Sequence, residues 1–361
     1  MFKKLFLLLS IFILFYGCVN KKKKDENSVN IANSVFKDIL NNEKEKIEYT
    51  IKTILGDSYY ESSKELYNPN MDKLISLVNL FSQDELSELI EGIRINFYSL
   101  GIDETDLLFL EYFPYLKRLK IIGGKNVNIE GLKYLRNLEE LELSHITIYN
   151  ISSISNLVSL KTLKLYGLIE IKDLSPISSL NSLESLYLWD LVSVNDISVI
   201  SNLINLEYLE INNIMQSRYI WNSIENFNPI FELINLRHLD FAYVRKGKDI
   251  TNIKKLIKLE SLRINIYNQA ELDIISYLPQ LRILEISSGN FNDVTPLLRL
   301  NKLEDIDFNS CSYHDIMPLA ASKSLKNIQM DFGPEKWYEF LDNGYELFKK
   351  NNIEVHPYDW R

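Results

Sequence analysis

The chain has 361 residues, of which 46% are hydrophobic and 25% are charged, a composition that excludes a disordered or fibrous protein. Its 49 acidic and 40 basic side chains give a net charge of -9, without the basic excess that nucleic-acid binding requires. The two cysteines, Cys18 and Cys311, lie in very different contexts, and the four histidines are scattered. We therefore expect no nucleic-acid partner, no disulfide framework, no metal site and no cofactor.

Residues 1–17 have the pattern of a secretory signal peptide. Lys3 and Lys4 precede an apolar run over residues 5–16, and Gly17 stands directly before Cys18. The run is shorter than the roughly 20 residues that a membrane-spanning helix needs. The Gly17-Cys18 pair resembles the lipobox of bacterial lipoproteins, which implies cleavage before Cys18 and acylation of that cysteine. An uncleaved signal-anchor is the alternative.

Residues 18–29 are predicted to form the lipidated cysteine and a polar tether. Four consecutive lysines, Lys21 to Lys24, are followed by further polar residues, which is typical of a flexible, solvated linker. Val19 rather than Asp after the cysteine favours sorting to the outer membrane or the cell surface over the inner membrane. The resemblance therefore implies a lipid-anchored protein of the cell envelope.

The middle of the chain repeats the pattern L-x-x-L-x-L ten times in register. The repeats begin at Leu116, Leu138, Leu160, Leu183, Leu206, Leu236, Leu259, Leu281, Leu303 and Leu325. Such periodicity indicates a solenoid in which each turn packs on its neighbours. Residues 113–332 resemble the leucine-rich repeats of bacterial surface proteins, the internalin-like 22-residue class. The resemblance implies an α/β solenoid of about ten turns with a parallel concave sheet.

Each turn continues from its strand into a helix-start pattern that recurs, with variations, from repeat to repeat. Asp173-Leu174-Ser175-Pro176 is one example, and it predicts a short helix or 3₁₀ segment with Ser175 as N-cap and Pro176 in the first turn. Thr295 and Pro296 fit the same description.

The two ends of the solenoid are expected to carry caps. Residues 30–112 are predicted to form a helical N-terminal cap, because Leu86, Leu89 and Ile93 have helical spacing and Ser82 with Glu85 forms a capping box. Residues 333–361 are predicted to form an α/β C-terminal cap. Its helix runs to about residue 350, and a closing strand contains residues 353–355.

Charged side chains line the predicted concave face. The residue after the first leucine of each repeat is charged, and its charge alternates in sign along most of the array. Stacked turns place these residues in one column, which we expect to be mainly a solvated series of ion pairs. Glu184 and Glu207 interrupt it as two adjacent acids that we expect to be uncompensated.

Aromatic residues gather at the same place. Tyr166 is expected beside Trp189, Tyr187 between Lys164 and Glu210, and Tyr208 beside His238. The nearby turn has 30 residues, and its extra stretch, residues 215–228, contains Tyr219, Trp221 and Phe227. The predicted partner-binding site comprises Tyr166, Glu184, Tyr187, Trp189, Glu207, Tyr208 and His238.

No arrangement of nucleophile, base, metal ligands or phosphate-binding glycines accompanies these residues. The sequence therefore predicts a non-enzymatic protein-binding module whose partner presents a basic patch to the concave face. A carbohydrate-binding surface protein, with Tyr166, Tyr187 and Trp189 stacked on sugar rings, is the alternative. A passive envelope component is the third interpretation.

Overall fold

The computed structural model describes residues 49, 51–52, 59–60, 64–69, 77–87, 90–100, 106–212, 224, 226–242, 249–312, 315–330 and 344–357. The predicted signal peptide (1–17), Cys18 and the tether (18–29) lie outside these residues, as do Tyr219 and Trp221 of the long turn. Within the described ranges, no helix is sufficiently long and apolar to span a bilayer.

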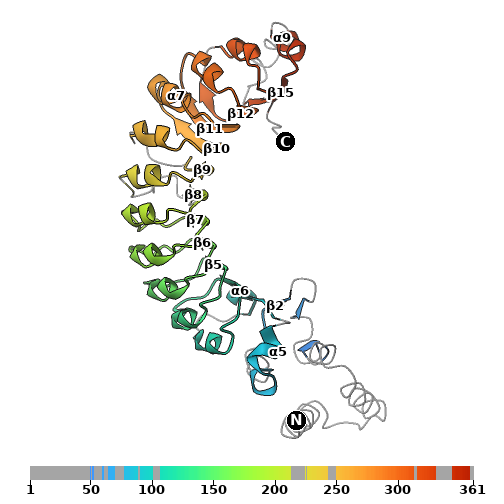
Figure 1. Ribbon diagram of the computed structural model, residues 1–361, viewed down its shortest axis with the longest axis vertical. Coiled ribbons are helices and arrows are strands. Elements are labelled where there is room, and N and C mark those ends of the chain that lie inside the picture. Colours follow the sequence, from blue (N-terminus) through green and yellow to red (C-terminus); the bar gives the residue numbers. More distant parts are fainter. Residues whose placement is uncertain are drawn as a thin grey trace.

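A single sheet lines the inner side of a curved solenoid, and short helices line its outer side (Figure 1). Its parallel strands follow chain order from β2 (Glu65–Tyr67) to β15 (Glu354–Pro357), and β1 (Tyr59–Tyr60) joins β2 antiparallel. The strands between them are β3 (Gly92–Asn96), β4 (Arg118–Ile122), β5 (Glu140–Ser144), β6 (Thr162–Tyr166), β7 (Ser185–Trp189), β8 (Tyr208–Asn212), β9 (His238–Asp240), β10 (Ser261–Ile266), β11 (Ile283–Asn290), β12 (Asp305–Phe308), β13 (Cys311–Ser312) and β14 (Asn327–Met330). The predicted leucine-rich-repeat solenoid with a parallel concave sheet is confirmed.

Most turns close through a 3₁₀ helix. These helices are η2 (Leu108–Tyr112), η3 (Glu130–Tyr134), η4 (Ser152–Asn156), η5 (Ser175–Ser179), η6 (Ser198–Asn202), η7 (Asn228–Glu232), η8 (Thr251–Lys255), η9 (Thr295–Arg299) and η10 (Met317–Ala321). One turn carries an α-helix instead, α7 (Gln269–Ile275), capped by Asn268, whose side chain accepts a hydrogen bond from the Glu271 backbone N–H. The other described α-helices are α5 (Gln83–Ser87), α6 (Phe97–Leu100) and α9 (Tyr345–Lys350).

The start of each 3₁₀ helix differs from the prediction in one respect. Ser175 is not the N-cap of η5, because Leu174 occupies that position and has no side-chain capping bond. The cap is supplied by Asp173, whose Oδ1 accepts the Ser175 backbone N–H at 2.7 Å and whose Oδ2 accepts the Ser175 hydroxyl at 2.7 Å. A carboxylate two residues earlier satisfies the first free N–H of the turn, so the serine hydroxyl is not needed for it.

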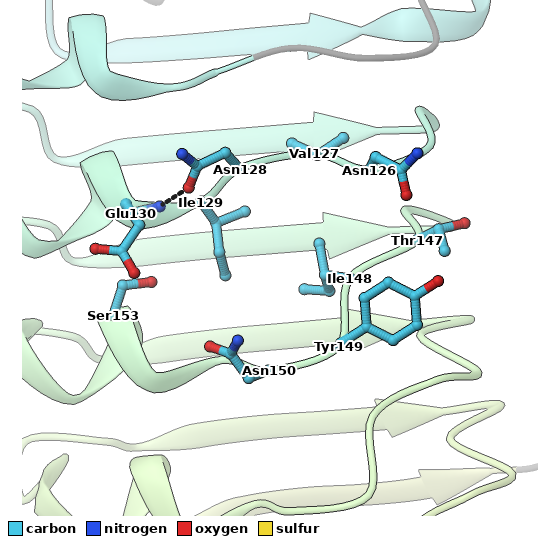
Figure 2. Close-up of a pocket in the computed structure, with 10 residues that line it drawn as sticks. All are labelled: Asn126, Val127, Asn128, Ile129, Glu130, Thr147, Ile148, Tyr149, Asn150 and Ser153. Carbon is cyan, nitrogen blue, oxygen red and sulfur yellow. Dashed lines mark hydrogen bonds between the residues drawn. The ribbon is translucent and has the colours of Figure 1, made fainter.

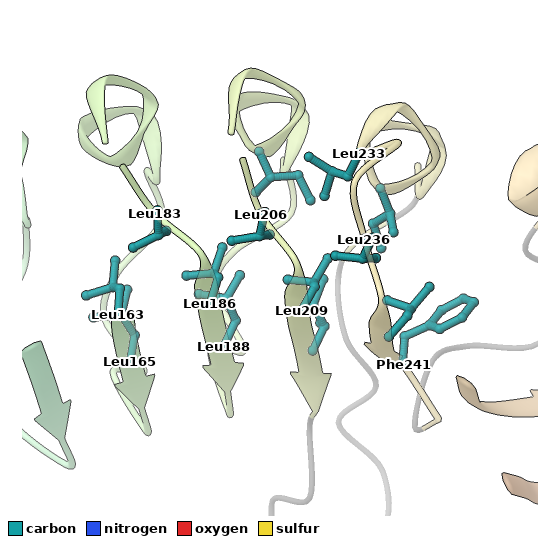
Figure 3. Close-up of a cluster of buried hydrophobic side chains, with 14 of the residues drawn as sticks. Leu163, Leu165, Leu183, Leu186, Leu188, Leu206, Leu209, Leu233, Leu236 and Phe241 are labelled. Atoms are coloured by element: carbon teal, nitrogen blue, oxygen red, sulfur yellow. The ribbon is translucent and has the colours of Figure 1, made fainter. Parts of the chain in front are cut away.

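The repeated leucines fill the interior of the solenoid. Leu186 and Leu209, in β7 and β8, have no exposed surface and lie directly opposite each other in the strand register. Figure 3 shows them with the leucines of adjoining turns and Phe241 in one continuous layer. Burial of these side chains drives the stacking of the turns, at about 25 cal/mol for each Å² of apolar surface removed from water.

A polar ladder joins successive turns at the approach to each strand. Asn205 donates its side-chain amide N–H to the backbone oxygen of Asn181 at 2.8 Å, and Asn235 donates to that of Ile204 at 2.8 Å. Ser182 makes the same contact to Val158 at 2.9 Å. These bonds satisfy carbonyl groups that no strand pairs.

The N-terminal region contains more sheet than the predicted helical cap. Helix α5 begins immediately after Ser82, as the capping box predicts. Ile93 is not on a helix, however, but in β3, where Ile93 and Ile95 alternate with more exposed residues. The buried residues Ile90, Ile93 and Ile95 repeat the L-x-x-L-x-L spacing with isoleucine, and β3 pairs with β4 as a further turn of the solenoid.

At the C-terminal end, β15 continues the sheet. It pairs in parallel with β14 and contains Val355, as the sequence predicts for a closing strand. Helix α9 packs beside it and ends at Lys350, while the first part of the predicted helix, residues 333–343, lies outside the described residues.

Candidate binding site on the concave face

The charged column at the entrance of the strands forms ion pairs between turns. Lys161 lies 3.1 Å from Glu139, and Glu304 pairs with Arg282 at 2.7 Å and with Lys326 at 2.6 Å. These side chains are largely exposed, so each pair contributes little to stability. The main effect of the column is that one edge of the concave face carries solvated side chains of both charges.

The predicted pair of uncompensated acids is only half present. Arg237 of the next turn reaches back to Glu207, with Nε 3.5 Å from its carboxylate, and forward to Glu260. The expectation for Glu207 is therefore wrong, because one long guanidinium side chain bridges two glutamates. Glu184 is exposed and forms no ion pair within the described part of the chain.

Five aromatic side chains form a patch across β6 to β9, which we call the aromatic patch. Its members are Tyr166, Tyr187, Trp189, Tyr208 and His238. Tyr166 and Trp189 lie opposite each other with ring centroids 4.8 Å apart. Tyr187 stacks on Tyr208 at 4.8 Å, and Tyr208 lies 5.7 Å from His238. All of the rings predicted to meet on this face do so.

A cation already lies against one end of the aromatic patch. The Lys164 ammonium is 5.6 Å from the centre of the Tyr187 ring and 2.8 Å from the Glu140 carboxylate. Its interaction with the ring face is the cation–π kind. With Tyr208 stacked on Tyr187 as well, the half-buried Tyr187 ring presents little free face to a ligand.

Two carboxylates lie side by side next to the aromatic rings, and we call them the acidic pair. Glu210 in β8 and Asp240 in β9 are direct neighbours in the strand register, and only 7% of Glu210 is exposed. Asp240 pairs with Arg263 at 3.3 Å, whereas Glu210 has no ion pair among the described residues and accepts a hydrogen bond from the Tyr208 hydroxyl at 3.2 Å.

Burial raises the pKa of Glu210, and the neighbouring Asp240 carboxylate raises it further. The pKa of Asp240 is also raised by burial, against the opposing effect of Arg263. Withdrawal from water disfavours the charged form of a carboxyl group, and a second negative charge adds to this. Glu210 is therefore a buried carboxyl group with no ion pair among the described residues, because Arg263, which pairs with Asp240, acts on it only from a greater distance.

Two further buried polar atoms near Glu210 have no hydrogen bond of normal geometry to any residue that the structure describes. They are the indole Nε1 of Trp189 and the side-chain Oδ1 of Asn212, residues that are paired in the register of β7 and β8. The Trp189 N–H is nevertheless close enough to lower the pKa of Glu210. Unsatisfied buried polar atoms are uncommon in folded proteins, and a ligand group is one way in which they are satisfied.

No protein-family model matches the sequence, and no curated protein does so either. Among solved structures, an internalin (InlF) from Listeria monocytogenes shares 23% identity with a TM-score of 0.57, and the match covers 86% of this chain and 89% of that one. The chain has an internalin-like leucine-rich-repeat fold.

A second solved structure of similar architecture comes from an animal protein. A chain of the mouse RP105/MD-1 complex shares 17% identity with a TM-score of 0.51, over 75% of this chain and 51% of that one. At these identities the likeness establishes the internalin-like fold alone, so the site is argued from its own geometry.

Three residues of this site were not predicted from the sequence: Glu210 as a buried charge, Asp240 and Asn212. A register signal for them was present, because Tyr187, Glu210 and Asp240 occupy one position in three consecutive L-x-x-L-x-L repeats. Conversely, Phe227 of the long turn is not a surface residue, because it is 4% exposed and packs against Phe241.

We expect Glu210→Gln to stabilise the protein at neutral pH. The folded-state pKa of Glu210 is raised, so ionisation of this carboxyl group opposes folding, and stability falls as pH rises through its titration. Glutamine stays neutral and still accepts the Tyr208 hydrogen bond. The thermal midpoint should exceed that of wild type at pH 7, and the difference should disappear near pH 3.5, below the usual glutamate pKa of about 4.3. Glu184→Gln, an exposed site, should show no such pattern.

Proposed function

We propose that the chain is an exported lipoprotein that binds another protein through its concave face. The observation that carries the proposal is the buried Glu210 carboxylate, which has no ion pair among the described residues and lies among the rings of the aromatic patch. A lysine or arginine from a partner would neutralise this charge and contact the rings at the same time. Exposed Glu184 and Glu207 at the rim would attract such a cation.

The aromatic rings support a protein ligand better than a sugar on this face. Partly buried tyrosine and tryptophan are the residues that most often dominate protein-binding energy. A sugar would need an open ring face, yet Tyr187 lies between Lys164 and Tyr208, and Trp189 is covered in part by Tyr166. The mouse chain of similar architecture occurs in a complex with another protein, which is in keeping with a protein partner.

A pull-down tests the binding function. The chain from residue 19 onward would be used as bait against envelope and extracellular proteins, with the Trp189→Ala variant in parallel. A partner retained by wild type and lost by the variant supports the proposal. If wild type retains nothing that the variant does not, the passive envelope component becomes the better interpretation.

The membrane anchor is a separate part of the proposal. If Cys18 is acylated, the mature protein should partition into the detergent phase, whereas Cys18→Ser should leave the chain unprocessed at its signal peptide. One acyl chain of myristoyl length holds a protein only marginally, so stable anchoring requires the several chains that the lipoprotein resemblance implies. Mass spectrometry of the wild-type N-terminus is the direct measurement. An intact, unacylated signal peptide there would show that the anchor is absent.

A further inference from the structure

A small pocket lies away from the concave sheet, on the segments that return from β4 and β5 to the 3₁₀ helices η3 and η4 (Figure 2). Its volume is about 280 Å³, at the lower end for ligand pockets, and it includes no residue of the aromatic patch or the acidic pair. In Figure 2, Ile129 and Ile148 occupy its centre, Tyr149 lies at one end, and Glu130 lies at the other.

The choice of asparagine at the edge of this pocket is informative. In the described part of the chain, nine turns use an acidic or amide side chain to accept the backbone N–H two residues later, at the start of the 3₁₀ helix. Six of them use aspartate: Asp106, Asp173, Asp196, Asp249, Asp293 and Asp315. Three use asparagine: Asn128, Asn150 and Asn226. Asn128 and Asn150, in consecutive turns, both line the pocket.

The backbone does not require this choice. Oδ1 alone accepts the backbone N–H, and Oδ2 of Asp173 and Asp293 only adds a bond from a hydroxyl, so aspartate and asparagine both serve the backbone of the turn. Asparagine differs by adding an amide group with two N–H donors. Neither amide nitrogen, of Asn128 or of Asn150, makes a hydrogen bond within the part of the chain that the structure describes, and both residues are exposed. The amide N–H groups of both asparagines are therefore available, at the edge of the pocket, to donate hydrogen bonds to a ligand.

The other residues that line the pocket indicate what kind of ligand it can hold. The Tyr149 ring is 68% exposed, so unlike the rings of the aromatic patch it can be covered by a ligand. Glu130 adds an exposed carboxylate acceptor, one oxygen of which lies 3.5 Å from the Lys133 ammonium, and the buried Ile148 adds an apolar surface. None of the lining residues is lysine, arginine or histidine. The Glu130 carboxylate offsets the charge of Lys133, so the pocket has no net positive charge to hold a phosphate or another anion.

We propose that this pocket binds one neutral pyranose ring of a carbohydrate. A pyranose has an apolar C–H face, which suits an exposed tyrosine ring, and a rim of hydroxyl groups that both accept and donate hydrogen bonds. Asn128 and Asn150 supply the donors for that rim, and Glu130 supplies an acceptor. The pocket volume fits a single ring better than a larger ligand. The site is independent of protein binding at the concave face.

Saturation-transfer NMR on the purified full chain tests this proposal. The probes are the methyl glycosides of glucose, galactose, mannose and N-acetylglucosamine, together with linear trisaccharides of each. We expect saturation transfer to the ring protons of at least one probe. Equal binding of glycoside and trisaccharide identifies a free or terminal sugar as the ligand, whereas binding of the trisaccharide alone identifies an internal ring of a longer chain.

Three variants locate the binding. Tyr149→Ala should weaken it about tenfold, and Tyr149→Phe, which keeps the ring, should restore most of it. Asn150→Asp keeps the turn but replaces donors by an acceptor, and should weaken binding about threefold or more. Asn226→Asp makes the same change in a turn outside the pocket and should have no effect. The proposal is overturned if no probe shows transfer, or if Tyr149→Ala and Asn150→Asp bind a probe as wild type does.

Discussion

Replacement of Leu209 by aspartate is expected to unfold much of the solenoid. Leu209 has no exposed surface and lies between Leu186 and Leu239 of the adjacent turns in the strand register. A carboxylate there would have no cation or hydrogen-bond donor within an apolar layer, and burial of an unpaired charge is very unfavourable. The loss, of order 4 kcal/mol or more, is a large part of the 5–15 kcal/mol that holds a typical domain folded.

Circular dichroism against temperature or denaturant measures this loss. Ile204→Asp is the matched control. It also replaces an aliphatic side chain by aspartate, but Ile204 lies in the segment that precedes β8 and its side chain is 62% exposed. Surface substitutions of this kind usually change stability by no more than about 0.5 kcal/mol. Lys326→Ala, which removes one ion pair of the rim, and Glu304→Ala, which removes two, should also be mild. Similar destabilisation by Leu209→Asp and Ile204→Asp would show that the assigned register is wrong.

The fold could be predicted from the sequence because the L-x-x-L-x-L spacing identifies both the strand of each turn and the residues that enter the core. In L-x-x-L-x-L the three leucines alternate with strand residues that face outward, so a single pattern fixes burial, register and the direction of the concave face. Tyr166 and Trp189, or Tyr208 and His238, could be placed opposite each other on that basis alone. Stacking of identical turns makes such local inference unusually reliable.

The first turn was missed because its core residues are not leucine. Ile90, Ile93 and Ile95 fill the same three positions and are equally buried. Isoleucine at this spacing also fits a helix with Leu86, and periodicity over so few residues does not separate the two. The deciding interaction is the pairing of β3 with β4, which is a long-range contact.

The electrostatics of the site were less predictable than its geometry. The order of charged residues in the repeats does not show which neighbour a long, flexible side chain will contact. Arg237 lies between Glu207 and Glu260 and contacts both. Burial of Glu210 depends on how the surrounding rings pack, which the repeat pattern leaves open. The acidic pair is consequently a finding of the structure rather than of the sequence.

Trp189→Ala is expected to weaken binding of a concave-face partner by about 2 kcal/mol or more, close to thirtyfold in Kd. The indole is half-buried against Tyr166 in the aromatic patch, and its N–H lies beside Glu210, so truncation removes contact area and a polar group together. Glu184→Gln should act mainly on the association rate, because exposed rim charges steer the encounter. Binding should also weaken with salt, since the Debye length is only about 8 Å at physiological ionic strength.

The measurement is a titration of the partner with each variant by calorimetry or surface plasmon resonance, after circular dichroism has shown that the variant is folded. Tyr277→Ala removes an aromatic ring that is 64% exposed in the turn after α7, outside the aromatic patch, and should bind as wild type does. Glu210→Gln removes the buried charge while keeping the shape, and should lower affinity only for a partner that inserts a cation. If Trp189→Ala and Glu207→Gln both bind the partner like wild type, the aromatic patch serves sheet packing alone, because a ring and a rim charge within a real interface could not both be dispensable.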